Sequence, residues 1–127
     1  MSLILVVDDD PQIRTFFRWL LEDELGHEVV FAADGQMAAE RFGKIDPDLV
    51  IVDLVMPRMH GVELITHLRG RYPGSTLIAI SGKGPAMLDK AMKAGAFAAL
   101  GKPLNRDELV TAIDRVLGLG DPWKDAE

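Results

Sequence analysis

The fold of this chain is decided by the segment LILVVDDD, residues 3–10, in which an apolar run passes directly into carboxylates. A wholly apolar run of this length is typical of a strand that is buried on both faces of a parallel sheet. Short apolar runs that stop at a polar or charged residue recur along the chain. They are Leu49–Val52 before Asp53, Leu77–Ile80 before Ser81 and Phe97–Leu100 before Gly101-Lys102, with Glu28–Ala32 as a weaker candidate.

Segments with helical periodicity separate these runs. An apolar stripe with the spacing i, i+3, i+4, i+7, i+8 extends from Ile13 to Leu21, and Leu109–Leu117 repeats it. Asn105 and Glu108 resemble a capping box in front of the last helix. The other helices are expected from Asp34-Gly35 through Phe42, over Gly61–Leu68 and over Pro85–Ala94. A strand followed by a helix, repeated five times, predicts an α/β fold with a parallel sheet and helices on both faces.

Composition limits the class of protein. The chain has 127 residues, which predicts one domain, and we assign residues 1–119 to it and residues 120–127 to a short polar tail. Its formal net charge of −6 gives no support for direct nucleic-acid binding. The absence of cysteine excludes a disulfide framework, a thiol nucleophile and a zinc site built on thiolates.

Nothing in the sequence predicts contact with a membrane. No apolar run approaches the roughly 20 residues that a membrane-spanning helix needs. The start of the chain, Met1–Ile4, lacks the basic region of a signal peptide. We therefore expect a cytoplasmic protein.

The residues that end the apolar runs carry the chemistry. Ligands of an open parallel sheet bind outside the carboxyl ends of the strands, where this sequence places Asp8-Asp9-Asp10, Asp53, Ser81 and Lys102. Asp10, which precedes Pro11, is better explained as a helix cap. Clustered carboxylates need a cation, and an all-oxygen ligand set favours Mg²⁺. A metal, an ammonium group, a hydroxyl and a spare carboxylate are the components of phosphoryl transfer to an aspartate.

The chain resembles the receiver domain of two-component response regulators, from Leu3 to about Leu117. That resemblance implies a flavodoxin-like, doubly wound (βα)5 fold with strand order 2-1-3-4-5. It also implies a phosphoacceptor signalling domain that catalyses only its own phosphorylation and dephosphorylation. The motifs that carry the resemblance are Val6-Val7-Asp8-Asp9-Asp10-Pro11, Asp53-Leu54-Val55-Met56-Pro57-Arg58-Met59-His60-Gly61, Ile80-Ser81-Gly82, and Gly95-Ala96 followed by Lys102-Pro103.

The same resemblance implies a role for each residue of the site. Asp53 would accept a phosphoryl group from a histidine kinase or a histidine phosphotransfer protein. Asp9, Asp53 and the backbone carbonyl of Val55 would bind Mg²⁺ directly, and Asp8 would bind it through water. Ser81 and Lys102 would contact the phosphoryl oxygens, and the Lys102-Pro103 bond would be cis. A phosphorylation-dependent contact with a downstream protein would be the output.

Two positions depart from the family pattern. The residue three positions before the lysine is usually aromatic and is Ala99 here, which predicts altered switching in which the Gly82-Lys83-Gly84 loop carries the signal. Val55 is apolar where some receivers place a polar group that orients water, which predicts slow loss of the phosphoryl group. The histidines His27, His60 and His67 are expected at the surface, without metal-ligand spacing.

Two other functions stay open beside the receiver. Ala99 is compatible with a scaffold that binds its partner independently of phosphorylation. Asp8-x-Asp10 superficially suits a small aspartate-nucleophile phosphatase, although that reading leaves Asp53-x-x-x-Pro57 unexplained.

Exposed apolar residues would mark partner surfaces. Trp19 lies off the apolar stripe, so it is either an interface anchor or a shield beside the tail near Trp123. The fourth helix and fifth strand, with the fifth helix, would form an output or homodimer face. The apolar residues of this face are Met87, Met92, Phe97 and Ala99. At least half of these four residues are expected to be buried.

Overall fold

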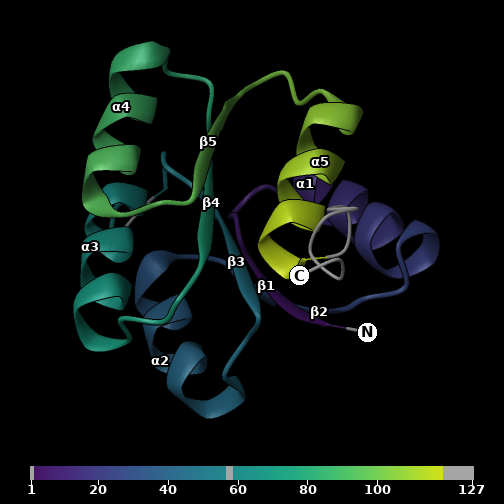
Figure 1. The fold of residues 1–127 in the computed structure, drawn as a ribbon, viewed down its shortest axis with the longest axis horizontal. Coiled ribbons are helices and arrows are strands. Elements are labelled where there is room, and N and C mark those ends of the chain that lie inside the picture. Colours follow the sequence, from purple (N-terminus) through teal and green to yellow (C-terminus); the bar gives the residue numbers. More distant parts are fainter. Residues whose placement is uncertain (1, 57–58, 119–127) are drawn as a thin grey trace, which may run out of the picture.

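A computed structural model describes residues 2–56 and 59–118 of the chain. It contains a five-stranded parallel sheet in the order β2-β1-β3-β4-β5, which confirms the predicted flavodoxin-like fold and strand order (Figure 1). The strands are β1 (Leu3–Val7), β2 (Glu28–Ala32), β3 (Leu49–Asp53), β4 (Leu77–Ser81) and β5 (Ala98–Gly101). The helices are α1 (Pro11–Phe17), the π-helix η1 (Arg18–Glu24), α2 (Gly35–Ile45), α3 (Gly61–Arg71), α4 (Pro85–Ala94) and α5 (Arg106–Leu117).

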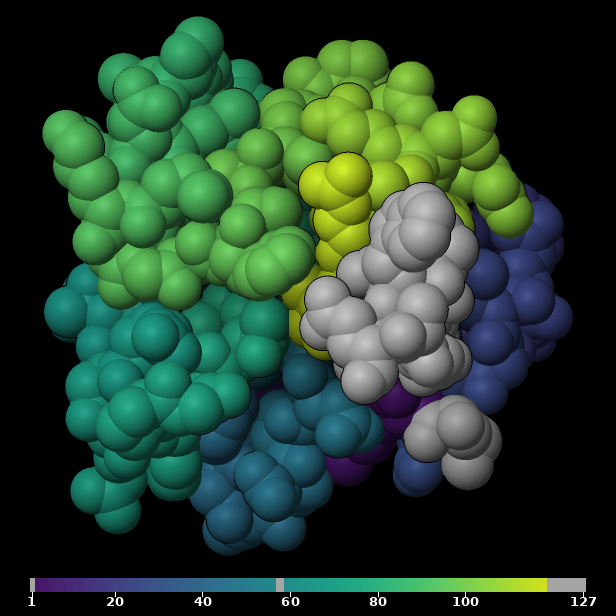
Figure 2. All heavy atoms as spheres, in the orientation of Figure 1, coloured from purple at the N-terminus to yellow at the C-terminus, as the bar shows by residue number. Residues whose placement is uncertain are grey.

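The sheet separates two hydrophobic cores. Because successive side chains of a strand point to opposite faces, Leu5 and Val7 enter one core while Ile4 and Val6 enter the other. The first core is closed by α2, α3 and α4, and the second by α1, η1 and α5 (Figure 1). The space-filling view shows α3 and α4 side by side along one edge of the molecule (Figure 2).

Local capping explains where two helices begin. Asp10 lies at the N-cap of α1 and accepts a 2.9 Å hydrogen bond from the Gln12 N–H, so the prediction of a capping role is confirmed. Asn105 accepts a 3.0 Å hydrogen bond from the Glu108 N–H at the start of α5. That bond is the first half of the predicted capping box.

The predicted apolar stripe from Ile13 to Leu21 extends over two elements, because α1 ends at Phe17 and η1 continues the helix to Glu24. One strand boundary differs from the prediction. The fifth strand starts at Ala98, and Phe97, which the apolar run included, lies before it with 49% of its surface exposed. An apolar run records burial but not the residue at which backbone pairing begins, so strand ends are poorly determined by sequence.

The expected surface positions are also partly wrong. His27 is buried, because it lies against the N-terminal strand and its Nδ1 accepts a 3.2 Å hydrogen bond from the Ser2 N–H. His60 and His67 are exposed, as predicted. Trp19 is half exposed, in agreement with its position off the apolar stripe, and its ring approaches that of Phe16. The predicted proximity to Trp123 and the predicted tail, residues 120–127, lie outside the described residues.

The fourth helix and the fifth strand expose more apolar surface than the sequence predicts. Met92 and Phe97 are exposed, whereas Met87 and Ala99 are partly buried against the first core. None of these four residues is fully buried, so the expectation that half of them would be is wrong. Within the described ranges, no helix is long and apolar enough to cross a membrane.

Candidate functional site

The polar residues that end the strands meet at one edge of the sheet. Asp8 directly follows β1, Asp53 and Ser81 are the last residues of β3 and β4, and Lys102 directly follows β5. The parallel register pairs Val7 with Val52 and Ser81 with Gly101, which brings these strand ends to the same level. All four side chains therefore border the end of the sheet where β1 and β3 are adjacent and the order of strands reverses.

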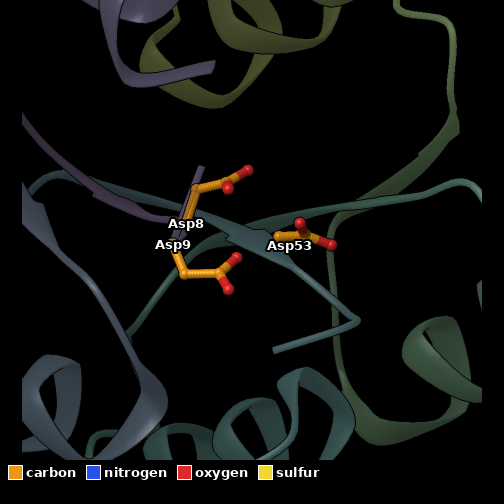
Figure 3. A group of neighbouring side chains, drawn as sticks. All are labelled: Asp8, Asp9 and Asp53. Atoms are coloured by element: carbon orange, nitrogen blue, oxygen red, sulfur yellow. The ribbon is translucent and has the colours of Figure 1, made fainter. Parts of the chain in front are cut away.

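Three carboxylates converge at this point. Asp8, Asp9 and Asp53 each bring one oxygen to within 4.8 Å of the others (Figure 3). Figure 3 shows the three side chains extending from the ends of two neighbouring strands into the same space. Asp8 and Asp53 are buried, and Asp9 is exposed. The cluster is thus open to solvent on the side of Asp9.

The buried carboxyl of Asp8 is held at an electrostatic cost. The pKa of Asp8 is raised from 3.8 to about 6, mainly by burial and in part by the nearby charges of Asp53 and Asp9. The Asp10 N–H, which donates a 2.8 Å hydrogen bond to Asp8 Oδ1, and the Lys102 ammonium act in the opposite direction. Asp8 Oδ2 is buried without a hydrogen-bond partner among the described residues.

These features fit a hard divalent cation. An unpartnered buried carboxylate oxygen close to two further carboxylates lacks the positive charge that would offset its loss of hydration. The ligand atoms are all oxygen, the type that Mg²⁺ prefers over nitrogen and sulfur. The residues present therefore match the magnesium site that the sequence predicts.

The carboxylate of Asp53 is oriented from two sides. Its Oδ1 accepts a 3.0 Å hydrogen bond from the Val55 N–H, and its Oδ2 lies 3.1 Å from the Lys102 ammonium nitrogen. Asp53 is 5% exposed, so the end of its side chain is accessible only at the edge of the sheet. A carboxylate fixed in this way can act as a nucleophile without first losing side-chain freedom.

Ser81 ends the neighbouring strand β4, and its hydroxyl oxygen accepts a hydrogen bond. The Lys83 N–H donates a 3.0 Å hydrogen bond to Ser81 Oγ, and the serine is 1% exposed. Because Oγ serves as the acceptor in that bond, the hydroxyl proton stays available for an oxyanion bound at Asp53. The Lys102-Pro103 bond is cis, as predicted.

The remaining predicted positions are also located. Val55 is 41% exposed, while the neighbouring Leu54 is buried. Ala99 pairs with Ala79 in the sheet and contributes only a methyl group to the first core. Pro57 and Arg58 lie outside the described residues.

The structure adds contacts that the sequence reasoning missed. The sequence analysis predicted the carbonyl of Val55 as a metal ligand, but it did not predict the hydrogen bond from the Val55 N–H to Asp53. The bond from the Lys83 N–H to Ser81 was also missed. Both donors lie two residues beyond the side chain that they bind, which is the spacing of a short polar residue that bonds its own backbone, and this spacing could have revealed them.

Comparison with known proteins gives consistent matches. The family model described as the response regulator receiver domain matches residues 4–114. The chain is 34% identical over 118 residues to the chemotaxis protein CheY of Thermotoga maritima, covering 89% of this chain and 95% of that protein. It is 38% identical over 103 residues to the Regulator of RpoS of Escherichia coli, covering 80% of this chain and 30% of that protein.

Solved structures agree in fold. A crystal structure of a response regulator receiver domain protein from Clostridium thermocellum superposes with a TM-score of 0.86 at 30% sequence identity. The match covers 93% of this chain and 95% of that one.

Proposed function

This chain belongs to the response regulator receiver family, whose general function is phosphoryl acceptance in signalling, and we propose that its acceptor is Asp53. The donor is a histidine kinase or a histidine phosphotransfer protein. The observation that carries the proposal is the Asp53 carboxylate, held between the Val55 N–H and the Lys102 ammonium beside two further carboxylates.

Mg²⁺ is the proposed cofactor. Asp9, Asp53 and the Val55 carbonyl would hold it directly, and Asp8 through water. When bound, the metal neutralises the carboxylates and stabilises negative charge on the phosphoryl oxygens. The burial of Asp8 and its unpartnered oxygen support this assignment.

The proposed transfer is a single displacement at phosphorus. A carboxylate oxygen of Asp53 forms a bond to the phosphorus, and the bond from phosphorus to the donor's imidazole nitrogen breaks with its electron pair retained on that nitrogen. Lys102 offsets the charge on the transferred group, and Ser81 donates a hydrogen bond from its hydroxyl group to a phosphoryl oxygen. The reaction modifies the chain itself, so the protein is a signalling domain and not an enzyme with an external substrate.

The proposed output is a phosphorylation-dependent contact with a downstream protein in the cytoplasm. The apolar surface around α4 and the start of β5, where Met92 and Phe97 are exposed, is the site proposed for that contact or for a phosphorylation-linked homodimer with α5. No direct contact with nucleic acid or membrane is proposed.

The position of Ala99 favours a second candidate, a scaffold whose binding does not respond to phosphorylation. A methyl group at this position lacks the bulk to couple Ser81 to the outer surface of β5. The phosphatase has less support, because the Asp10 side chain, which would be its second acid, caps α1 instead.

Intact mass after incubation with acetyl phosphate and Mg²⁺ tests the proposal. We expect one base-labile phosphoryl adduct on the wild-type chain and none on Asp53→Asn or after chelation of the metal. An unmodified wild-type chain, under conditions that modify a known receiver, would contradict the assignment. Partner binding that is unchanged by Asp53→Ala would support the scaffold, and turnover of a generic phosphate ester would support the phosphatase.

A further inference from the structure

Gly35, the first residue of α2, is in direct contact with Met59. A Cβ atom built on Gly35 would lie 2.4 Å from the Met59 carbonyl oxygen, 2.8 Å from its Cβ and 3.1 Å from its carbonyl carbon. The backbone of Gly35 does not have a positive φ, so its conformation is open to any residue. Glycine lowers the stability of a helix. The close approach of Met59 is therefore the physical reason for a glycine at this position.

Met59 belongs to a short strip, residues 59–61, that lies between α2 and the end of β3. On the other side of the strip, a Cβ on Gly61 would lie 2.5 Å from Leu54 Cα and 2.7 Å from the Asp53 carbonyl oxygen. The Gly61 N–H also donates a 3.3 Å hydrogen bond to the Leu54 carbonyl. The strip thus contacts α2 at Met59 and the backbone of Asp53 and Leu54 at Gly61, without free space at either contact.

Neither neighbour of the strip can move aside easily. Helix α2 is held by its cap, where Asp34 accepts a 2.8 Å hydrogen bond from the Met37 N–H, and by Ala38 and Phe42 in the core. The obstructing atoms at Gly35 include the Met59 backbone, which cannot be relieved by a change of rotamer. A side chain at position 35 would therefore push the strip toward Asp53 and Leu54.

That displacement would reach the groups that define the site. Leu54 is anchored by its N–H, which donates a 2.9 Å hydrogen bond to the Ile80 carbonyl. The next residue, Val55, orients Asp53 through its N–H and carries the carbonyl proposed as a metal ligand. Small displacements of groups that hold a metal ligand have large effects on affinity, since the ligand must be placed to within a fraction of an ångström.

We infer that Gly35 is a positioning residue: the start of α2 sets the place of the segment after Asp53, and so the geometry of the Val55 amide and carbonyl. The inference rests on the proposed function, because Mg²⁺ binding at Asp53 and Val55 is what the contact would adjust. Gly35 itself touches neither the metal nor the phosphoryl group.

The chain offers a matched control for this inference. Gly43 is in the same helix, and a Cβ there would lie 2.6 Å from Tyr72 Oη, the far end of a side chain remote from the site. Gly35→Ala and Gly43→Ala thus make the same chemical change in α2, each against a close neighbour. Only Met59, the neighbour of Gly35, belongs to the strip that contacts the backbone of Asp53.

The experiment measures Mg²⁺ affinity by calorimetry and the NMR resonance of the Val55 amide in both variants. We expect Gly35→Ala to weaken Mg²⁺ binding about 10-fold and to shift the Val55 resonance before metal is added. Its phosphorylation by acetyl phosphate should slow at low Mg²⁺ and recover at saturating Mg²⁺. Gly43→Ala should match the wild type in all three measurements.

Wild-type affinity and an unshifted Val55 resonance in a folded Gly35→Ala variant would overturn the inference, and so would an equal loss in Gly43→Ala. If Gly35→Ala does not fold, an NMR titration of the wild-type chain with Mg²⁺ tests the inference instead. Coupling between α2 and the metal site requires that Mg²⁺ shifts the Gly35 amide resonance and leaves the Gly43 amide resonance in place. A wild-type chain that binds no Mg²⁺ would overturn the proposed function instead. The Val55 resonance in the two variants would still decide the inference.

Discussion

The ammonium nitrogen of Lys102 lies 3.1 Å from Oδ2 of Asp53, although the two residues are 49 positions apart in the chain. Asp53 ends β3 and Lys102 follows β5, with β4 between these strands. The ion pair therefore spans the width of a strand and places a positive charge where a phosphoryl group would bind.

Removing this charge should slow phosphorylation. In Lys102→Met the stem of the side chain is kept and the ammonium is lost, so the phosphoryl oxygens lose one electrostatic partner. We expect the rate with acetyl phosphate to fall roughly 100-fold, as follows from loss of one such group. A time course of intact mass measures the rate. Lys90→Met, on the exposed face of α4, should react like the wild type.

Asp8→Asn should stabilise the metal-free protein. A carboxyl whose folded pKa is raised contributes stability that is present below its unfolded pKa of 3.8 and is lost as the pH rises through about 6. At about pH 7.5 the ionised Asp8 therefore costs on the order of 1–3 kcal/mol. Urea unfolding with a chelator should show that gain in the variant, and a smaller one near pH 4.5.

Asp10→Asn provides the comparison for that measurement. Asparagine caps a helix about as well as aspartate, so this isosteric change should leave the free energy of unfolding nearly unchanged. Equal gains from the two substitutions would mean that net charge, and not the burial of Asp8, is responsible.

His27 should make the fold sensitive to acid. Burial lowers the pKa of His27, so the unfolded chain takes up a proton at a higher pH than the folded one. The stability associated with the neutral ring is present above the unfolded pKa of 6.5 and is lost as the pH falls below it. The difference in free energy of unfolding between wild type and His27→Gln should therefore change in this pH range, and urea unfolding at several pH values measures it.

Val55 should determine how long the phosphoryl group persists. Its side chain is exposed and apolar beside Asp53, so it offers no group that would orient a water molecule for attack. Val55→Asn should shorten the lifetime of the adduct several-fold, followed by intact mass after removal of the donor. A wild-type lifetime of seconds in the presence of Mg²⁺ would contradict this prediction.

Gly61 should be far less tolerant of substitution than Gly70 in the same helix. A Cβ at position 61 would meet the backbone of Asp53 and Leu54, whereas a Cβ at position 70 would enter open space among the described residues. We expect Gly61→Ala to cost about 2 kcal/mol or more. Gly70→Ala should instead stabilise the chain by about 0.5–1 kcal/mol. Thermal or urea unfolding of both variants checks the difference.

The site residues could be predicted from the sequence because each of them ends or directly follows an apolar run, which is a local feature of the sequence. The apolar run from Leu3 predicts a buried strand, and the carboxylates that follow it must then lie at the end of a parallel sheet. Asp53, Ser81 and Lys102 were found by the same rule, and the structure brings them together. Site residues that follow directly from strand ends are thus accessible to sequence reasoning.

Other features depend on contacts between distant segments. The burial of His27 arises from its hydrogen bond to the N-terminal strand, and the exposure of Phe97 arises from its place just before the outermost strand. Neither the burial of His27 nor the exposure of Phe97 produces a periodic pattern in the surrounding sequence. The sequence reasoning therefore misplaced both side chains.

By itself, then, the sequence determined the succession of strands and helices along the chain, the helices on both faces of the sheet and the identity of the polar residues at its edge, because alternating apolar periods fix which faces must be buried. Tertiary structure alone decided the raised pKa of Asp8, the pairing of Lys102 with Asp53 and the contact of Gly35 with Met59. These properties depend on distances of a few ångströms between atoms from different elements, and such distances exist only once the whole chain is packed.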